Sequence, residues 1–295
     1  MNFRGLHFHH LKDKNFHRLL FITIAILGSI NIYYTYNYVV YDPLREDFNK
    51  NIGKKYNLEL DLQKKEEEVK TGSIKIPILI YHSVRDHING EDNMLKYYTV
   101  SPESFTKQMQ YLKDNNYSVL SLDFIADALE ENIPVPEKSV AITFDDGWRN
   151  QYVNAYPILR RFGYTATFFI ITNTIDKPHF FSWDQVRLMN NNGMTIGSHT
   201  VFHPFLPEIE NPKELQKELV NSKKVIEEKL GHTVDIFAYP YGHYNDEVVN
   251  AVKSAGYKLA RSTHKGIYHT KSDLFTMKGI EVTDDMKRFA IDINN

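Results

Sequence analysis

The sequence contains no cysteine among its 295 residues. The chain therefore has no disulfide bond, no cysteine nucleophile, no thiolate ligand for a metal and no cysteine for lipid attachment. Any metal site must be built from histidine and carboxylate side chains. Cysteine usage gives no information on the cellular compartment.

The sequence also lacks an excess of charge of either sign, because its formal net charge is -2 and its pI is near 6.7. Proteins that bind nucleic acid normally carry a basic patch or domain, so we do not expect nucleic acid as a partner. Internal repeats and low-complexity tracts are absent, which excludes a solenoid. The length suits one barrel-sized domain with an appendage.

One long run without charged residues extends from Leu19 to Val40. Its length is close to the roughly 20 residues that span a bilayer. Basic residues precede the run and tyrosines crowd its far end, a pattern typical of a helix with its N-terminus inside. We interpret residues 1–18 as a cytoplasmic basic tail and 19–40 as a transmembrane anchor. A cleaved signal peptide, giving a secreted protein, is the alternative, although residues 27–31 offer a poor cleavage site.

The segment after the anchor, residues 41–73, is mostly polar and includes the charged run 64–68. This composition is typical of a stalk that holds a domain away from a membrane. We expect the folded domain to cover residues 74–295 and to lie on the extracellular side of the cell membrane.

From residue 74 onward, short β-rich runs alternate with segments of helical periodicity, as in successive β-α units. The predicted strands are 76–81, 117–120, 140–144, 166–171, 195–197, 236–239, 257–260 and 274–278. The pattern predicts an α/β fold, an irregular (β/α) barrel of about seven or eight strands. We expect irregularity because the loop over 82–101 is long and no helix follows the last strand.

Local signals mark the ends of several predicted helices. Ser101 and Pro102 indicate an N-cap and a first helical position, and Ser182 caps a helix over 183–192. The longest helix, 212–230, should stop at Gly231. Functional side chains of such barrels lie where strands end and loops begin, so strand ends are the place to search.

The strand 140–144 leads directly into Asp145, Asp146 and Gly147. Adjacent carboxylates at a strand end point to different sides, so one can bind a metal while the other accepts a proton. An Asp-Asp-Gly sequence is also an ordinary turn, and by itself it does not decide between the two interpretations.

A second strand, 195–197, is followed by His199 and His203. Two histidines four residues apart can bind one ion if the segment turns helically, although they can equally be surface residues of a loop. Together with Asp146 they supply one carboxylate and two imidazole nitrogens. This is the ligand set of a borderline divalent ion with open positions for water and substrate.

Two further strand ends carry polar or turn residues. His82 follows the strand 76–81, and the sequence Tyr239-Pro-Tyr-Gly242 follows the strand 236–239. Taken singly, the first is more often a structural histidine and the second a Pro-Gly loop. Four such clusters at the ends of different strands favour a common site.

At these residues the sequence resembles the polysaccharide deacetylases of the NodB-homology group, carbohydrate esterase family four. The motifs that carry the resemblance occur in order: Thr143 to Gly147, Ser198 to Pro204, and Tyr239 to Gly242. The resemblance covers roughly residues 74–290. Within the group the chain is most similar to the poly-N-acetylglucosamine deacetylases of the intercellular adhesion protein B type, which share the early Ile80-Tyr-His-Ser83 segment.

The resemblance implies a hydrolase that removes N-acetyl groups from a polysaccharide with one bound divalent metal. Zinc is the first expectation, with cobalt, nickel or manganese as alternatives. The implied ligands are Asp146, His199 and His203. The implied general base is Asp145.

An amine leaving group needs a proton as the carbon–nitrogen bond breaks, and His82 is the residue that the resemblance implies for this step. The backbone N–H of Tyr241, beside Pro240, is implied to stabilise the oxyanion.

The chain departs from the family pattern in two places. A C-terminal Leu-x-His motif is poorly matched around His264, which is why His82 is preferred as the acid. An arginine that often precedes the third motif is replaced by Ala238, so another group must orient Asp145. Arg149 is the candidate that the sequence offers.

Poly-β-1,6-N-acetylglucosamine of biofilm is the expected substrate of a monomeric, membrane-anchored enzyme. Peptidoglycan N-acetylglucosamine is the alternative, favoured by the unmodified spacing from His199 to His203. A carbohydrate-binding relic without activity is a third interpretation. Both aspartates and both histidines are present, which weighs against it.

Overall fold

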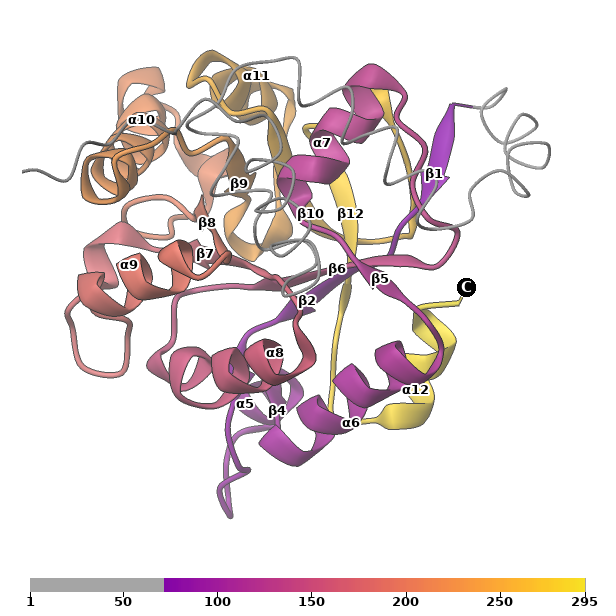
Figure 1. Cartoon of the computed structure of the whole chain (residues 1–295). Helices are drawn as coiled ribbons and strands as arrows, with labels where there is room; N and C mark the ends of the chain where they lie inside the picture. Colours follow the sequence, from indigo (N-terminus) through magenta and orange to yellow (C-terminus); the bar gives the residue numbers. More distant parts are fainter. Residues whose placement is uncertain (1–71, 295) are drawn as a thin grey trace, which may run out of the picture. The chain divides into compact units, whose positions relative to one another are not determined.

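The protein, described here by a computed structural model over residues 72–294, is built on a closed barrel of parallel strands (Figure 1). Seven strands form the ring, and the pairing of β2 with β6 closes it. In order around the ring they are β2 (Ile78–Tyr81), β12 (Met277–Glu281), β10 (Leu259–Lys265), β9 (Ile236–Ala238), β8 (Thr195–Ser198), β7 (Thr167–Ile170) and β6 (Ser139–Phe144). An eighth strand, β5 (Ser118–Val119), extends the sheet from β6 outside the ring.

Side chains of the ring strands alternate between two buried layers, as the period of two in a strand requires. On β6, Val140 and Ile142 belong to the larger core, which lies between strands and helices, whereas Ala141 belongs to a second cluster. That second cluster contains Phe169 and Leu259 from other ring strands and also residues of α7 (Leu122–Glu131). It is the interior of the barrel, so inward-facing positions are 141, 143 and, one step further, 145.

The outer layer consists of helices whose ends agree with local sequence signals. Its members are α6 (Pro102–Asp114), α8 (Tyr156–Phe162), α9 (Trp183–Asn191), α10 (Pro212–Leu230) and α11 (Asp246–Ser254). The predicted caps are confirmed, because Ser101 caps α6, Ser182 forms a capping box on α9, and Gly231 ends α10 in a left-handed conformation. A π-helical segment, Gln151–Ala155, leads into α8. Short 3₁₀ turns cover Thr172–Thr174, Leu206–Glu208, Pro240–Gly242 and Lys271–Asp273.

The connection from β2 to α6, predicted as a long loop, contains three short elements. They are β3 (Ser83–Val84), α5 (Asn93–Tyr97) and β4 (Thr99–Val100), and β3 pairs with β4 in parallel. This connection therefore has a defined shape directly after His82.

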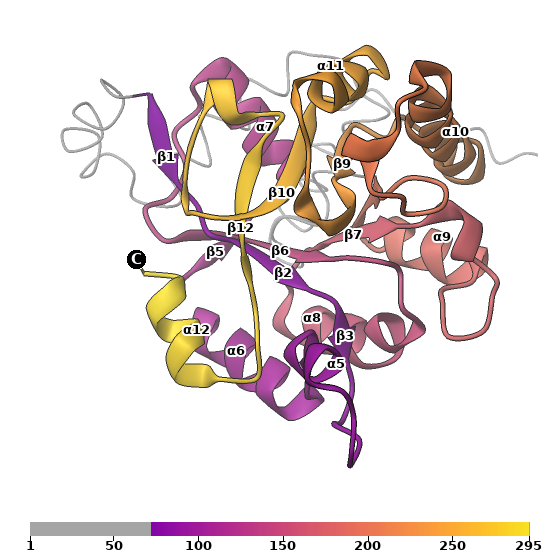
Figure 2. The same ribbon diagram turned by 180° about the vertical axis from the view of Figure 1, so that it is seen from behind.

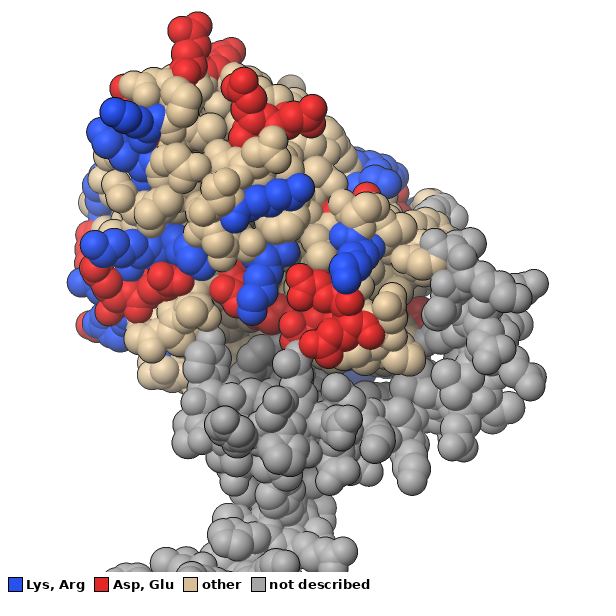
Figure 3. All heavy atoms as spheres, turned by 90° about the horizontal axis from the view of Figure 1, so that it is seen from above, with Lys and Arg blue, Asp and Glu red and all other residues tan. Residues whose placement is uncertain are grey.

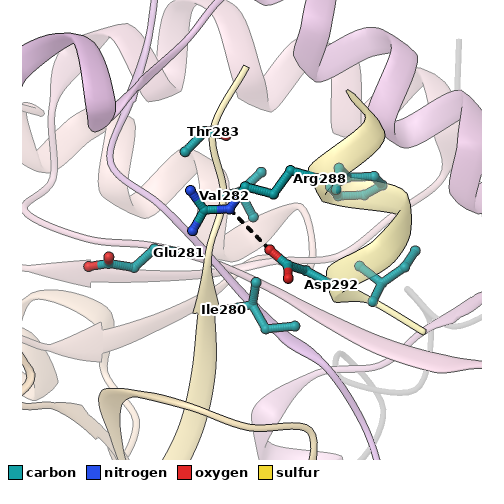
Figure 4. A pocket seen from close by; sticks show the side chains of 8 residues that line it. Ile280, Glu281, Val282, Thr283, Arg288 and Asp292 are labelled. Atoms are coloured by element: carbon teal, nitrogen blue, oxygen red, sulfur yellow. Dashed lines mark hydrogen bonds and ion pairs between the residues drawn. The ribbon is translucent and has the colours of Figure 1, made fainter. Parts of the chain in front are cut away.

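The expected absence of a helix after the last strand is wrong. Helix α12 (Met286–Asp292) follows β12, begins at the capping residue Asp285 and lies beside α6 (Figures 1 and 2). The rings of Tyr111 and Phe289 meet edge to face with centroids 5.9 Å apart. Figure 4 shows the small recess between β12 and α12, beside which Arg288 Nε lies 3.2 Å from Asp292 Oδ2. The last two ring strands begin two or three residues later than predicted.

The N-terminal edge of the described region is β1 (Ser73–Lys75), which pairs antiparallel with β11 (Tyr268–Thr270). The predicted start of the folded domain, residue 74, lies within β1. The predicted tail, the anchor 19–40 and the stalk up to residue 71 lie outside the described residues. Within residues 72–294, none of the helices has the length and apolar character needed to cross a bilayer. On the face turned to the viewer in Figure 3, acidic and basic side chains are mixed.

Candidate active site

The residues singled out at strand ends meet at one end of the barrel. His82 directly follows β2, Asp145 follows β6 and His199 follows β8. Because all ring strands run parallel, their carboxyl ends lie on the same face. Register brings two of the positions side by side, since Tyr81 pairs with Phe144 and the N–H of Asp145 donates to the carbonyl of Tyr81 at 2.9 Å.

Asp145 is a carboxylate held almost completely inside the barrel, with 3 % of its side chain exposed. It continues the inward-facing series of β6, and its Oδ1 accepts a hydrogen bond from Arg261 Nη2. Its other oxygen, Oδ2, lies 3.8 Å from Nε2 of His82. The Nε2 of Gln151 donates to the backbone carbonyls of both His82 and Asp145, which ties the two strand ends together.

The charge state of Asp145 results from two opposing influences. Burial by itself raises its pKa, but the positive charge of Arg261, helped by His199 and His82, more than compensates, so the pKa is lowered from the usual value. Asp145 is therefore ionised at neutral pH and is able to accept a proton.

The side chains of Asp146, His199 and His203 converge beside Asp145. The two imidazole Nε2 atoms lie 3.1 Å apart, and each lies 3.7 Å from Oδ1 of Asp146. One donor atom from each residue falls within 4.8 Å of the others, the arrangement of a metal site. Donor atoms this close to one another are placed to share one cation.

The protonation of His199 also fits a metal ligand. Its Nδ1 lies 2.8 Å from the carbonyl oxygen of Ala238, which only accepts, so Nδ1 carries the proton and Nε2 has the free lone pair. Burial lowers the pKa of His199 to about 4 and also lowers the pKa of His203. Both rings are therefore neutral near pH 7, as metal binding requires.

Trp148 determines the orientation of the Asp146 carboxylate, the third donor of the cluster. Its indole N–H donates to Oδ2 of Asp146 at 3.0 Å, which leaves Oδ1 toward the two imidazoles. The indole ring stacks on Phe180 with centroids 4.4 Å apart. Asp146 itself has φ of 72°, and this left-handed turn directs its side chain away from the inward path of Asp145.

The segment from His199 to His203 is not the helical turn that the four-residue spacing suggested. It runs as an irregular loop in which Thr200 has φ of 67° and His203 has φ of 59°. The N–H of His203 donates to Thr200 Oγ1 at 2.9 Å. Left-handed residues at both positions reverse the chain locally, and this brings both rings toward Asp146.

The Tyr239-Pro-Tyr-Gly242 segment forms a 3₁₀ turn at the same end of the barrel. Pro240 is buried, whereas Tyr241 is 57 % exposed and its ring centroid lies 4.5 Å from that of His203. Tyr241 and Gly242 both have positive φ. A Cβ on Gly242 would collide with Thr263, so only glycine fits this turn.

The two histidines considered for the acid role lie in different surroundings. The ring of His82 contacts that of Tyr98, with centroids 4.6 Å apart, and lies next to Asp145. His264 is exposed, and its Nδ1 lies 3.3 Å from the hydroxyl of Tyr244.

Arg261 is the residue that the sequence analysis missed. It is fully buried on β10, across the barrel from β6, and its guanidinium lies 5.2 Å from the ring of Phe169. Arg149, the predicted partner of Asp145, instead donates from Nε to the carbonyl of Phe180 and is exposed, so that prediction is wrong. The predicted strand ended at residue 260, which left Arg261 in a loop. In a longer strand, the alternation from Leu259 would have placed it inward.

Comparison with known proteins gives the family. A model of the polysaccharide deacetylase family matches residues 132–260. YxkH, a Bacillus subtilis protein assigned as a polysaccharide deacetylase, is 32 % identical over 236 residues, which are 78 % of this chain and 81 % of its own. The chain belongs to the polysaccharide deacetylase family.

Two other proteins extend this comparison. The poly-β-1,6-N-acetyl-D-glucosamine N-deacetylase of Staphylococcus aureus is 28 % identical, over 70 % of this chain and 78 % of its own. The structure of the Streptococcus pyogenes deacetylase PplD, in complex with acetate, has a TM-score of 0.67 and 31 % identity, over 72 % of this chain and 94 % of PplD. Members of the family are hydrolases that act on amide carbon–nitrogen bonds, and this chain is one of them.

Proposed function

We propose that this protein is a metal-dependent N-deacetylase of poly-β-1,6-N-acetylglucosamine outside the cytoplasm. The observation that carries the proposal is the convergence of three metal donors beside a buried, arginine-held carboxylate. Asp145 lies outside the group of three donors and is ionised at neutral pH, so it is free to accept a proton from water.

Each side chain has one task in this proposal. Asp146, His199 and His203 would hold a divalent ion, zinc in the first place, which makes water more acidic and polarises the acetyl carbonyl. Asp145 accepts the proton of the attacking water, and Arg261 keeps it oriented and ionised. His82 donates a proton to the departing sugar nitrogen. The backbone N–H of Tyr241, in the turn fixed by Pro240 and Gly242, stabilises the developing oxyanion.

The choice of glycan rests on the Staphylococcus aureus relative, which is named for poly-β-1,6-N-acetyl-D-glucosamine. The purified chain should release acetate from this polymer faster than from peptidoglycan in parallel assays. The Asp145→Asn variant controls for contaminating hydrolases. Release from peptidoglycan alone would transfer the function to that glycan, and release from neither would contradict the proposal.

Replacement of a proposed ligand should reduce metal content and activity together. We expect His203→Ala to bind zinc at least about 10-fold more weakly, because one of three protein donors is lost. Elemental analysis after dialysis measures the bound metal, and acetate release measures activity. His264→Ala, a change of the same type at an exposed histidine, should alter neither. Full activity of metal-stripped wild-type protein would disprove metal dependence.

The choice of substrate can distinguish the acid role of His82 from the roles of the neighbouring residues. His82→Ala should retain its metal and lose about 10²- to 10⁴-fold in rate on an N-acetyl substrate, because the amine leaves only when protonated. The rate of the variant on an activated aryl acetate, whose leaving group needs no proton, should fall far less. Equal losses on both substrates would remove His82 from this role and direct attention to His264, whose alanine variant is the matched comparison.

The location of the domain is proposed from the sequence alone, since residues 1–73 carry the predicted tail, anchor and stalk. With the N-terminus inside, protease added to intact cells should remove the catalytic domain, because the domain would face the medium. Immunoblotting with an antibody against the domain measures the loss, and a cytoplasmic protein serves as the control. Protection until the cells are lysed would contradict an extracellular substrate.

A further inference from the structure

The loop that carries His199 and His203 has a costly backbone conformation. Thr200 and His203 are both left-handed, with φ of 67° and 59°. A left-handed φ is unfavourable for residues other than glycine, and Thr is a poor choice because it is β-branched. A conformation of this kind persists only where neighbouring groups hold it.

Glu218 of α10 is bound to the middle of this loop. One of its oxygens, Oε2, accepts hydrogen bonds from the N–H of Val201 at 2.9 Å and of Phe202 at 3.0 Å. These two donors lie between the proposed metal ligands. Hydrogen bonds to a carboxylate are about twice as strong as those between neutral groups. We propose that Glu218 is a positioning residue that holds the loop so that both imidazoles face the same ion.

The helix that carries Glu218 is itself fixed to the strand from which the loop leaves. Ser198 at the end of β8 donates from Oγ to Oγ of Ser222 at 2.8 Å, and both side chains are buried. Ser222 in turn donates to the carbonyl of Glu218 at 2.7 Å. Tyr257 donates to the neighbouring carbonyl of Leu219 at 2.9 Å. Glu218 therefore holds the loop from a helix that is hydrogen-bonded to the end of β8.

The loop held by Glu218 has a specific consequence for metal binding. Because the loop is held, the two Nε2 atoms are already 3.1 Å apart without an ion. Without Glu218 the loop relaxes toward ordinary φ values, and metal binding must restore the costly conformation. The inference rests on the proposed function, because it needs His199 and His203 to bind a metal. It predicts weaker metal affinity, with turnover close to normal once the metal is saturating.

The test measures zinc affinity of the full chain in three variants. Glu218→Ala removes both acceptors, Glu218→Gln keeps a neutral acceptor, and Glu228→Gln is the control. Glu228 lies on the same helix with 63 % of its side chain exposed, and its Oε1 lies 3.8 Å from Nζ of Lys224. Chelator-treated protein is titrated with zinc by calorimetry, and its thermal unfolding is recorded without metal.

We expect Glu218→Ala to bind zinc about 10- to 100-fold more weakly than wild type, as for other groups that orient metal ligands. The zinc affinity of Glu218→Gln should lie between those of Glu218→Ala and wild type. The zinc affinity of Glu228→Gln should match that of wild type. Wild-type zinc affinity in folded Glu218→Ala, or the same loss in Glu228→Gln, would overturn the proposal. So would a lower melting temperature without a change in affinity.

If Glu218→Ala does not fold, Glu218→Gln decides by the same criterion. Wild-type protein that binds no zinc would instead contradict the proposed function. The two failures are thereby distinguished.

Discussion

Asp145→Asn is expected to retain its metal and lose nearly all turnover. The amide preserves the shape of the side chain and still accepts a hydrogen bond from Arg261, but it cannot take a proton from water. General base catalysis contributes about 10²- to 10⁴-fold, so acetate release should fall by at least that range. Metal content should not change, because Asp145 is not among the three converging donors.

The measurement combines acetate release with elemental analysis of the same sample. Asp184→Asn, the same change at an exposed aspartate, is the matched control and should retain full activity. If Asp145→Asn retained more than about a tenth of the wild-type rate, another group would have to act as the base. If it lost its metal as well, Asp145 would have to be counted among the ligands.

Arg261→Met is expected to have the largest effect on stability. The substitution leaves the carboxylate of Asp145 buried without its cation, and removal of one partner of a buried ion pair costs about 3 to 5 kcal/mol. Methionine provides an apolar side chain of similar reach beside Phe169. Denaturant unfolding in the presence of a chelator measures the free energy of unfolding without a contribution from metal binding.

The double variant Asp145→Asn with Arg261→Met distinguishes the effect of an unpaired charge from the effect of lost packing. Its free energy of unfolding should return most of the way to the wild-type value, because no unpaired charge is left in the barrel. Arg187→Met, at an exposed arginine paired with Asp184, should change stability by less than about 0.5 kcal/mol. A double variant as unstable as Arg261→Met would mean that packing, not charge, explains the effect.

The same pair predicts a dependence on pH. The pKa of Asp145 is lowered in the folded protein, where the charge of Arg261 outweighs the effect of burial. A group of this kind stabilises the fold above its unfolded pKa near 4, and the contribution is lost as the pH falls below that value. Without Arg261, burial raises the pKa of Asp145 above its usual value, so protonation relieves the variant first. The difference in stability between wild type and Arg261→Met should therefore begin to shrink above about pH 4 and continue to shrink as the pH falls below about 4.

The features that could be predicted from the sequence are those decided by interactions between residues close together in the chain. Ser101 and Ser182 cap their helices and Gly231 ends α10, because each cap is decided within a few residues. The ends of β2, β6 and β8 were also predicted to within one residue, and parallel strands bring their carboxyl ends together. The prediction that Asp146, His199 and His203 form one cluster depends on nothing further, and the structure places them together.

The features that could not be predicted depend on contacts between distant segments. Arg261 meets Asp145 across 116 positions of the chain, and no local pattern identifies a partner on the opposite wall of a barrel. The conformation of the loop between the two histidines is held by Glu218, from a helix later in the chain. The spacing alone left a helical turn and an irregular loop open, because it contains no information on this contact. Helix α12 was missed because its seven residues are too few to show a clear helical period.

The hydrogen bond from Trp148 to Oδ2 of Asp146 has a consequence for the choice of ion. A carboxylate with one oxygen already engaged is a monodentate ligand, so the protein supplies one oxygen and two nitrogens. Calcium requires six to eight oxygen ligands and often takes carboxylates in bidentate mode, whereas imidazole suits zinc, nickel and copper. If Asp146, His199 and His203 hold a metal as proposed, the indole N–H and the two imidazoles together should disfavour calcium at this site.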